Sequence, residues 1–197
     1  MNVRLLAAVL MAVAACGPAS VPADAAFAEV DGVVLTPDPP YELVVRPGDF
    51  VGINPAAGVD DVNEQLYPPG PAAAFETFVL VEDAELWAEL DAADPLDRDG
   101  FVLLEASHGG DDAVAHWDPD GRIASGRVAV DVDLPMDERL TGLAHVRDYS
   151  MRGLGVVLGL AADPSGIGSC MAEPPDWKCN ITLADRERLR DAIGDRP

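Results

Sequence analysis

The segment from Leu143 to Leu160 constrains the fold most strongly. It is predicted to form one long helix, although glycine occupies positions 153, 155 and 159. Each glycine inside a helix costs about 1 kcal/mol relative to alanine, so this helix must be stabilised by close packing against other elements. The apolar content of 49% supplies enough side chains for a sizeable core. The chain is therefore predicted to fold as a domain built around this helix.

The remaining elements are predicted from apolar periodicity and from turn residues, and together they indicate an α+β fold. A Pro-Pro-Gly-Pro break at 68–71 separates the early segments from the later ones. A final helix is predicted over Leu183–Ile193, with Thr182 and Asp185 in a near capping box. Strands are expected at 33–36, 41–46, 50–54, 77–81, 101–107, 114–117 and 127–134, and a further helix at 84–93.

The first residues predict export. Arg4 precedes an apolar run from Leu5 to Ala15, which is too short to span a bilayer. The run ends in small residues followed by Cys16, and this ending resembles a bacterial lipobox. That resemblance implies a signal peptide over 1–15 and lipid on Cys16, with the protein anchored in the bacterial cell envelope, facing the periplasm or the cell surface. The alternative is an ordinary secretory signal with an incidental cysteine. A flexible tether is expected over 16–30 and the domain over 31–197.

Two further cysteines, Cys170 and Cys179, are separated by eight residues. In an oxidising compartment such a pair is expected to form a disulfide. A two-cysteine metal site is the alternative, but the close spacing and a nearby histidine are both absent.

The formal net charge of −22 excludes nucleic acid as a partner and opposes contact with anionic lipid head groups. Membrane contact is therefore expected through the lipid anchor alone. Two Asp-x-Asp-Gly segments, 97–100 and 118–121, are interpreted as turns, because neither continues as a calcium-binding loop.

The segment from Arg152 to Asp163 resembles the metzincin zinc-protease pattern H-E-x-x-H-x-x-G-x-x-H-D. Its framework positions match: Leu154, Gly155, Leu158, Gly159, Leu160 and Asp163. Its chemistry positions do not, because Arg152, Val156 and Ala162 stand at the three histidines and Gly153 stands at the catalytic glutamate. Catalysis in this family needs the three histidines as zinc ligands and the glutamate as the base.

The resemblance extends over residues 100–194 and is closest to the matrixin branch. The segment around Met171 resembles the Met-turn, and the final helix resembles the closing helix of that family. The segment Val114-Ala115-His116-Trp117 resembles the edge strand along which matrixins bind peptides. The resemblance therefore implies a zincin-like mixed sheet with an edge strand, a long degenerate active-site helix, a Met-turn and a C-terminal helix.

No substitute catalytic or metal site emerges from the other residues. His116 matches one ligand of the second, structural zinc of matrixins, but Val130 stands where another ligand would be. His108 lacks a correctly spaced aspartate, and Ser107 beside it lacks an orienting acid. No cofactor is expected, and Arg152 is expected to occupy the position of the zinc charge and to pair with Asp163.

These observations predict a non-catalytic, lipid-anchored pseudo-protease that binds a peptide or protein through its sheet edge. One alternative is an active zinc metallopeptidase with ligands placed elsewhere in the chain. The other is a structural envelope lipoprotein with no ligand.

Overall fold

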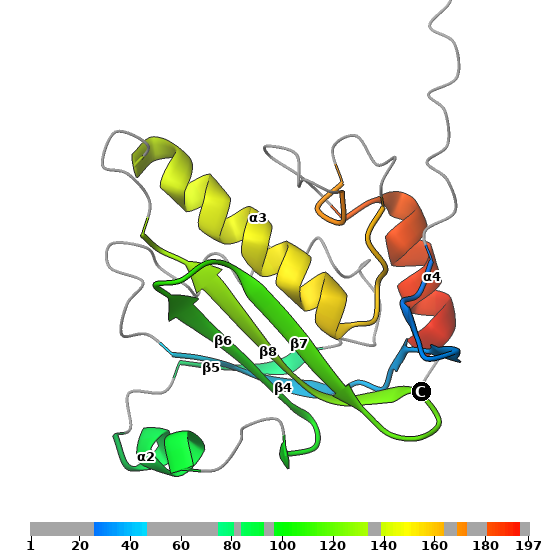
Figure 1. Cartoon of the computed structure of the whole chain (residues 1–197), viewed down its shortest axis with the longest axis horizontal. Helices are drawn as coiled ribbons and strands as arrows, with labels where there is room; N and C mark the ends of the chain where they lie inside the picture. Colours follow the sequence, from blue (N-terminus) through cyan, green and yellow to red (C-terminus); the bar gives the residue numbers. More distant parts are fainter. Residues whose placement is uncertain are drawn as a thin grey trace, which may run out of the picture.

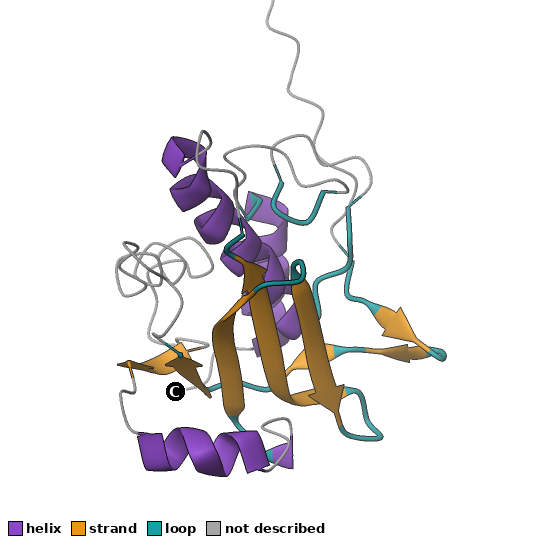
Figure 2. Cartoon of the chain, turned by 60° about the vertical axis from the view of Figure 1, so that its left-hand side comes forward, coloured by secondary structure: helices purple, strands orange, loops and turns teal. Residues whose placement is uncertain are grey.

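The computed structural model describes residues 26–46, 75–80, 84–92, 97–133, 139–163, 169–172 and 181–193. The predicted signal peptide, Cys16, Cys179 and the predicted strand at 50–54 lie outside these residues. Within them the fold is mixed α/β, and a curled, largely parallel sheet is covered by helices (Figures 1 and 2).

The strands are β1 (Glu29–Val30), β2 (Val33–Val34), β3 (Thr36–Pro37), β4 (Tyr41–Val45), β5 (Phe75–Leu80), β6 (Phe101–Ser107), β7 (Asp112–Trp117) and β8 (Arg122–Asp131). The helices are α2 (Ala84–Ala92), α3 (Arg139–Val157) and α4 (Leu183–Ile193). The main sheet has the order β3-β8-β6-β4-β5, and all of these neighbours are parallel. β7 pairs antiparallel with β8, so it forms an edge of the described sheet.

The main core lies between this sheet and α3, which packs across β7 and β8 (Figure 1). Val102 and Leu104 of β6 and Val128 and Val130 of β8 face this core, because alternate residues of a strand point to the same side. On the opposite side, Trp87 and Leu90 of α2 pack against Phe101 and Leu103 of β6, with Val44 of β4. The sheet is therefore covered on both faces in the part of the chain that the structure describes, as expected for parallel strands.

The helix α3 ends earlier than Leu160, the residue predicted from the sequence. Gly159 has a φ of +81°, a conformation that glycine adopts without the steric cost of a Cβ atom. The N–H of Leu160 donates to the carbonyl of Gly155 at 2.9 Å, and the N–H of Gly159 donates to that of Val156 at 2.8 Å. These two bonds form a Schellman motif that closes the helix.

The residues just before β1 pair with the end of α3. Ala28 donates a backbone hydrogen bond to Gly159 at 2.7 Å, and Ala161 donates one to Ala26 at 2.8 Å. Phe27 forms an isolated bridge with Leu160 and packs on the core. The residues 26–28 are thus hydrogen-bonded to the chain that follows α3.

The predicted strand at 33–36 forms two short strands, β2 and β3, and the strand predicted to begin at Arg127 begins at Arg122 instead. The predicted capping box is confirmed: the N–H of Asp185 donates to Thr182 Oγ1, and the N–H of Thr182 donates to Asp185 Oδ2, both at 3.2 Å. Among the described residues, no helix is both long enough and apolar enough to cross a membrane.

Candidate functional site

The end of α3 and the segment 169–172 form the region where the sequence predicts a degenerate protease site. The N–H of Met171 donates to Ser169 Oγ at 3.0 Å, and the N–H of Ala172 donates to the carbonyl of Ser169 at 3.1 Å. This tight turn places the Met171 side chain, which is 1% exposed, beneath Gly155 of α3. A Cβ atom on Gly155 would lie 2.7 Å from Met171 Sδ, so glycine is what allows the two to approach.

The four chemistry positions of the motif offer no zinc ligand and no catalytic base. Gly153 is buried against Val128, where a side chain would collide, Val156 is half-buried, and Ala162 is exposed. A guanidinium such as that of Arg152 remains positively charged and has no lone pair to donate to a metal. The residues at these positions therefore do not fit the catalytic zinc that the family resemblance implies.

Arg152 connects α3 to the turn. Its Nη1 donates to the carbonyl of Ala172, the residue that follows Met171. The backbone N–H of Asp163 donates to the carbonyl of Met171 at 2.7 Å. The helix and the chain after it thus hold the turn from both sides. The expected pairing of Arg152 with the carboxylate of Asp163 stays a prediction.

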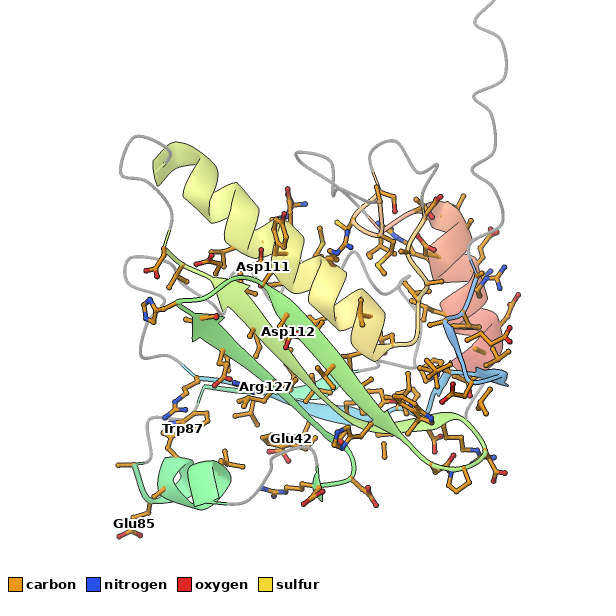
Figure 3. The ribbon with its side chains drawn as sticks, in the orientation of Figure 1. Glu42, Glu85, Trp87, Asp111, Asp112 and Arg127 are labelled. Carbon is orange, nitrogen blue, oxygen red and sulfur yellow. The ribbon has the colours of Figure 1, made fainter. Side chains whose placement is uncertain are left out.

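Tyr149 lies one helical turn before Arg152. Partial burial raises the pKa of the Tyr149 phenol above its ordinary value of 10.0; the carboxylate of Asp111 raises it further, and the guanidinium of Arg152 opposes both effects. Asp111 lies beside α3, just before β7 (Figure 3). The start of the edge strand is therefore electrostatically coupled to α3, which the sequence did not reveal because the residues are far apart along the chain.

The predicted edge residues have different exposures. Val114 and Trp117 are 38% and 41% exposed, Ala115 is buried and His116 is half-buried. Val114 and His116 lie opposite Arg127 and Ser125 of β8. Of the strands that the structure describes, β8 alone pairs with β7.

Backbone hydrogen bonds show which groups of β7 face outward. On the β6 side, the Ala124 carbonyl of β8 accepts from the Gly100 N–H, and the N–H of Val132, just after β8, donates to the Ser107 carbonyl. On the β7 side, the Asp131 N–H donates to Asp111 Oδ1. Because the backbone groups of successive residues alternate between the two sides of a strand, Ser125, Arg127 and Ala129 point to β7.

Their partners on β7 are His116, Val114 and Asp112, whose backbone groups must point back to β8. The backbone groups of the intervening residues, Ala113 and Ala115, are therefore directed to the outer edge. Their spacing of two residues is the spacing at which an added strand forms its hydrogen bonds.

On the sheet face that carries α2, Glu105 of β6 is buried between two arginines. Arg127 of β8 donates from Nε to Glu105 Oε1 at 2.6 Å and also contacts it through Nη2, while Arg46 Nη1 lies 3.7 Å from Glu105 Oε2. The Arg46 guanidinium also lies 4.9 Å from the ring centroid of Trp87, and Figure 3 labels Trp87 and Arg127. Sequence reasoning missed this cluster, although neighbouring strand residues such as Arg127 and Val128 point to opposite faces.

The histidines considered as substitute metal ligands are not brought together. His108 Nδ1 lies 2.9 Å from Asp133 Oδ1 on an exposed loop, while His116 lies on β7. No group of three or more metal-ligating side chains is present among the described residues. Asp118 Oδ1 accepts the N–H groups of Asp120 and Arg122, both at 2.9 Å, so the turn interpretation of 118–121 is confirmed. Cys170 is buried, and its predicted disulfide with Cys179 stays a prediction, because Cys179 lies outside the described residues.

Comparison with known proteins finds no matching protein-family model, no matching curated protein and no matching solved structure.

Proposed function

We propose that this chain is a lipid-anchored, non-catalytic relative of the matrixins that binds an extended peptide or protein segment along β7. The observation that carries the proposal is the outer edge of β7, where the backbone groups of Ala113 and Ala115 face away from β8. An extended segment can add to such an edge by backbone hydrogen bonds, which require no metal.

The matrixin relationship is supported by the order of elements. A strand (β6), an antiparallel edge strand (β7), a further strand (β8), a long helix (α3), a methionine-bearing turn and a final helix (α4) follow one another as the resemblance implies. The proximity of Met171 to Gly155 adds support. Gly155 directly precedes Val156, which stands at the second histidine position, and a Met-turn passes its methionine beneath the metal bound there. Fold analogy alone does not establish function, so the activity needs a direct test.

Zinc content separates the pseudo-protease from an active metallopeptidase. The full-length chain, purified without chelator and with zinc supplied, is expected to hold less than about a tenth of an equivalent of zinc, since a catalytic site needs three protein ligands. One tightly held equivalent, measured by mass spectrometry, would show that other residues bind zinc and would replace this proposal with the peptidase.

Strand addition is tested on the edge itself. Ala113→Pro removes one outward N–H at a position where an edge strand tolerates proline, whereas Ala113→Ser keeps that N–H. We expect the proline variant to bind an extended, β-branched decapeptide about fivefold to tenfold more weakly, the value of one net hydrogen bond. The serine variant should bind as the wild type does. Equal binding by all three proteins, with unchanged thermal unfolding, would show that the edge is not used.

A structural envelope lipoprotein would bind no peptide at all. Fluorescence anisotropy with the labelled decapeptide, at protein concentrations up to about 1 mM, covers the affinity range of weak strand addition. The absence of any binding over that range would favour the structural alternative.

A further inference from the structure

The two ends of β7 carry carboxylates, and this charge pattern says what kind of segment fits the edge. Asp111 and Asp112 stand at its start, both exposed, and Asp131 and Asp133 lie at the adjacent end of β8. Asp118 and Asp120 follow its end. Between these two acidic ends lie the exposed apolar side chains of Val114 and Trp117.

Several basic groups around β7 have partners among the residues that the structure describes. The guanidinium of Arg127, on the strand beside Val114, is paired with Glu105, which Arg46 also approaches. Arg152 donates to the Ala172 carbonyl, and His108 is paired with Asp133. At the other end of the strand, Arg122 lies 3.9 Å from Asp38. The carboxylates at the two ends of β7 therefore make the electrostatic potential along its edge negative.

Asp111 and Asp112 differ in the side of the sheet to which they belong. Consecutive strand residues point to opposite faces. Asp111 lies toward α3, where it acts on Tyr149 (Figure 3), and Asp112 shares the other face with Val114 and His116. A segment added to β7 would also alternate, so two consecutive basic side chains at this end would meet one carboxylate each.

We infer that the edge of β7 selects an extended segment in which two consecutive lysines or arginines lie opposite Asp111 and Asp112. An apolar residue follows in this segment, two positions from the basic residue opposite Asp112. The apolar residue would pack on Val114, since side chains directly opposite on neighbouring strands contact each other. This inference rests on the proposed function, because it assigns a ligand class to the same edge.

The test uses the full-length chain and three labelled decapeptides. The peptides share one sequence rich in β-branched residues and differ only at two consecutive positions, which are Lys-Lys, Gln-Gln or Glu-Glu. Each is made with the pair near either end, because the direction of addition is open. At about 20 mM salt the Lys-Lys peptide should bind about fivefold or more tightly than the Gln-Gln peptide, and the Glu-Glu peptide should bind more weakly still. The preference should largely disappear at about 0.5 M salt.

A pair of matched variants separates the local carboxylates from the overall charge. Asp111→Asn with Asp112→Asn should reduce the Lys-to-Gln affinity ratio to within about twofold, while the asparagine oxygen can still accept the Asp131 N–H. Glu187→Gln with Asp191→Asn removes equal charge from exposed positions of α4 and should leave the ratio unchanged.

Each contrary result has a distinct meaning. If both double variants kept the Lys-to-Gln affinity ratio, or reduced it equally, the overall net charge would explain the preference. The inference would then be wrong. Equal binding of all three peptides would overturn the inference and leave strand addition intact. Binding of none of them would overturn both proposals.

Discussion

At the scale of single residues, the glycines of α3 mark where other side chains contact the helix. Gly153 faces Val128 of β8, Gly155 faces Met171, and Gly126 on β8 faces Val157 of α3. At each of these positions a Cβ atom would lie within 2.7 Å of a neighbouring side-chain atom. The low helix propensity of glycine is therefore offset by close contact between helix and sheet.

Gly153→Ala should destabilise the protein even though alanine favours helix by about 1 kcal/mol. The new methyl group would lie 2.3 Å from Val128 Cγ1, and overpacking of this kind costs about 1–3 kcal/mol. We expect a net loss of about 1 kcal/mol in urea unfolding. In the double variant with Val128→Ala, about 1 kcal/mol of coupling should appear. A more stable Gly153→Ala protein would contradict the packing described.

The Tyr149 phenol should make stability depend on alkaline pH. Its pKa is raised, first by burial and then by Asp111, so the folded state holds the proton more tightly than the unfolded state does. The stabilising contribution is complete below the unfolded pKa, near 10, and is lost as pH rises through the folded pKa. Urea unfolding between about pH 9 and 11 should show a steeper loss for the wild type than for Tyr149→Phe. Identical slopes for the two proteins would show that Tyr149 is not the group responsible.

At the scale of elements, the two sides of β8 pair with different strands. One edge pairs with β6 and, at its start, with β3; the other pairs with β7. β7 thus pairs with β8 on one side and packs against α3 on one face. The backbone groups of Ala113 and Ala115 face away from β8. An edge strand that has no second partner among the described strands is a template for pairing with another strand.

The start of α4 depends on one side-chain pair. Thr182 Oγ1 lies 2.6 Å from Asp185 Oδ2, and each side chain also bonds the backbone N–H of the other. Thr182→Ala removes the N-cap oxygen and should cost about 1 kcal/mol. Thr182→Ser keeps it and should stay within about 0.5 kcal/mol of the wild type in urea unfolding. A fully stable alanine variant would mean that packing of Ile181 and Leu189 in the core alone determines where α4 begins.

At the scale of the whole molecule, the net charge of −22 acts on every folded contact. Like charges on a compact surface repel one another, and salt screens that repulsion. Raising NaCl from about 20 to 500 mM should increase the Tm by several degrees. A neutral osmolyte at matched osmolality serves as the control for solvent exclusion. A Tm that does not change with salt would show that the carboxylates are locally compensated.

How much of the fold could be predicted differed between elements. The predicted bounds of β6 and α4 agree with the observed ones, because an apolar run and a capping box are local patterns. The start of β8 was missed by five residues. Its alternation is interrupted at Ser125 and Gly126, which are both buried. The register with β7 shifts just before them, between Ser125 and Ile123, and pairing with β3 and β7 extends the strand across that interruption.

The candidate site was predicted in part. The strand predicted at 114–117 lies within β7, and the segment around Met171 forms a tight turn. The sequence did not identify Asp111 as a neighbour of Tyr149, the Ala172 carbonyl as the partner of Arg152, or the pairing of Glu105 with Arg127. Each of these contacts joins residues from different elements, so no local pattern contains it.

The sequence by itself determined which groups are available: the acidic balance, the absence of metal-binding side chains at four motif positions, and the glycines that permit close packing. Only the tertiary structure decided how those groups meet. Among the described strands β7 lies at an edge because only β8 pairs with it, and Asp111 and Asp112 lie there because the turn before β7 places them there. Side-chain identity is a local property, whereas strand order and register arise from contacts between distant segments of the chain.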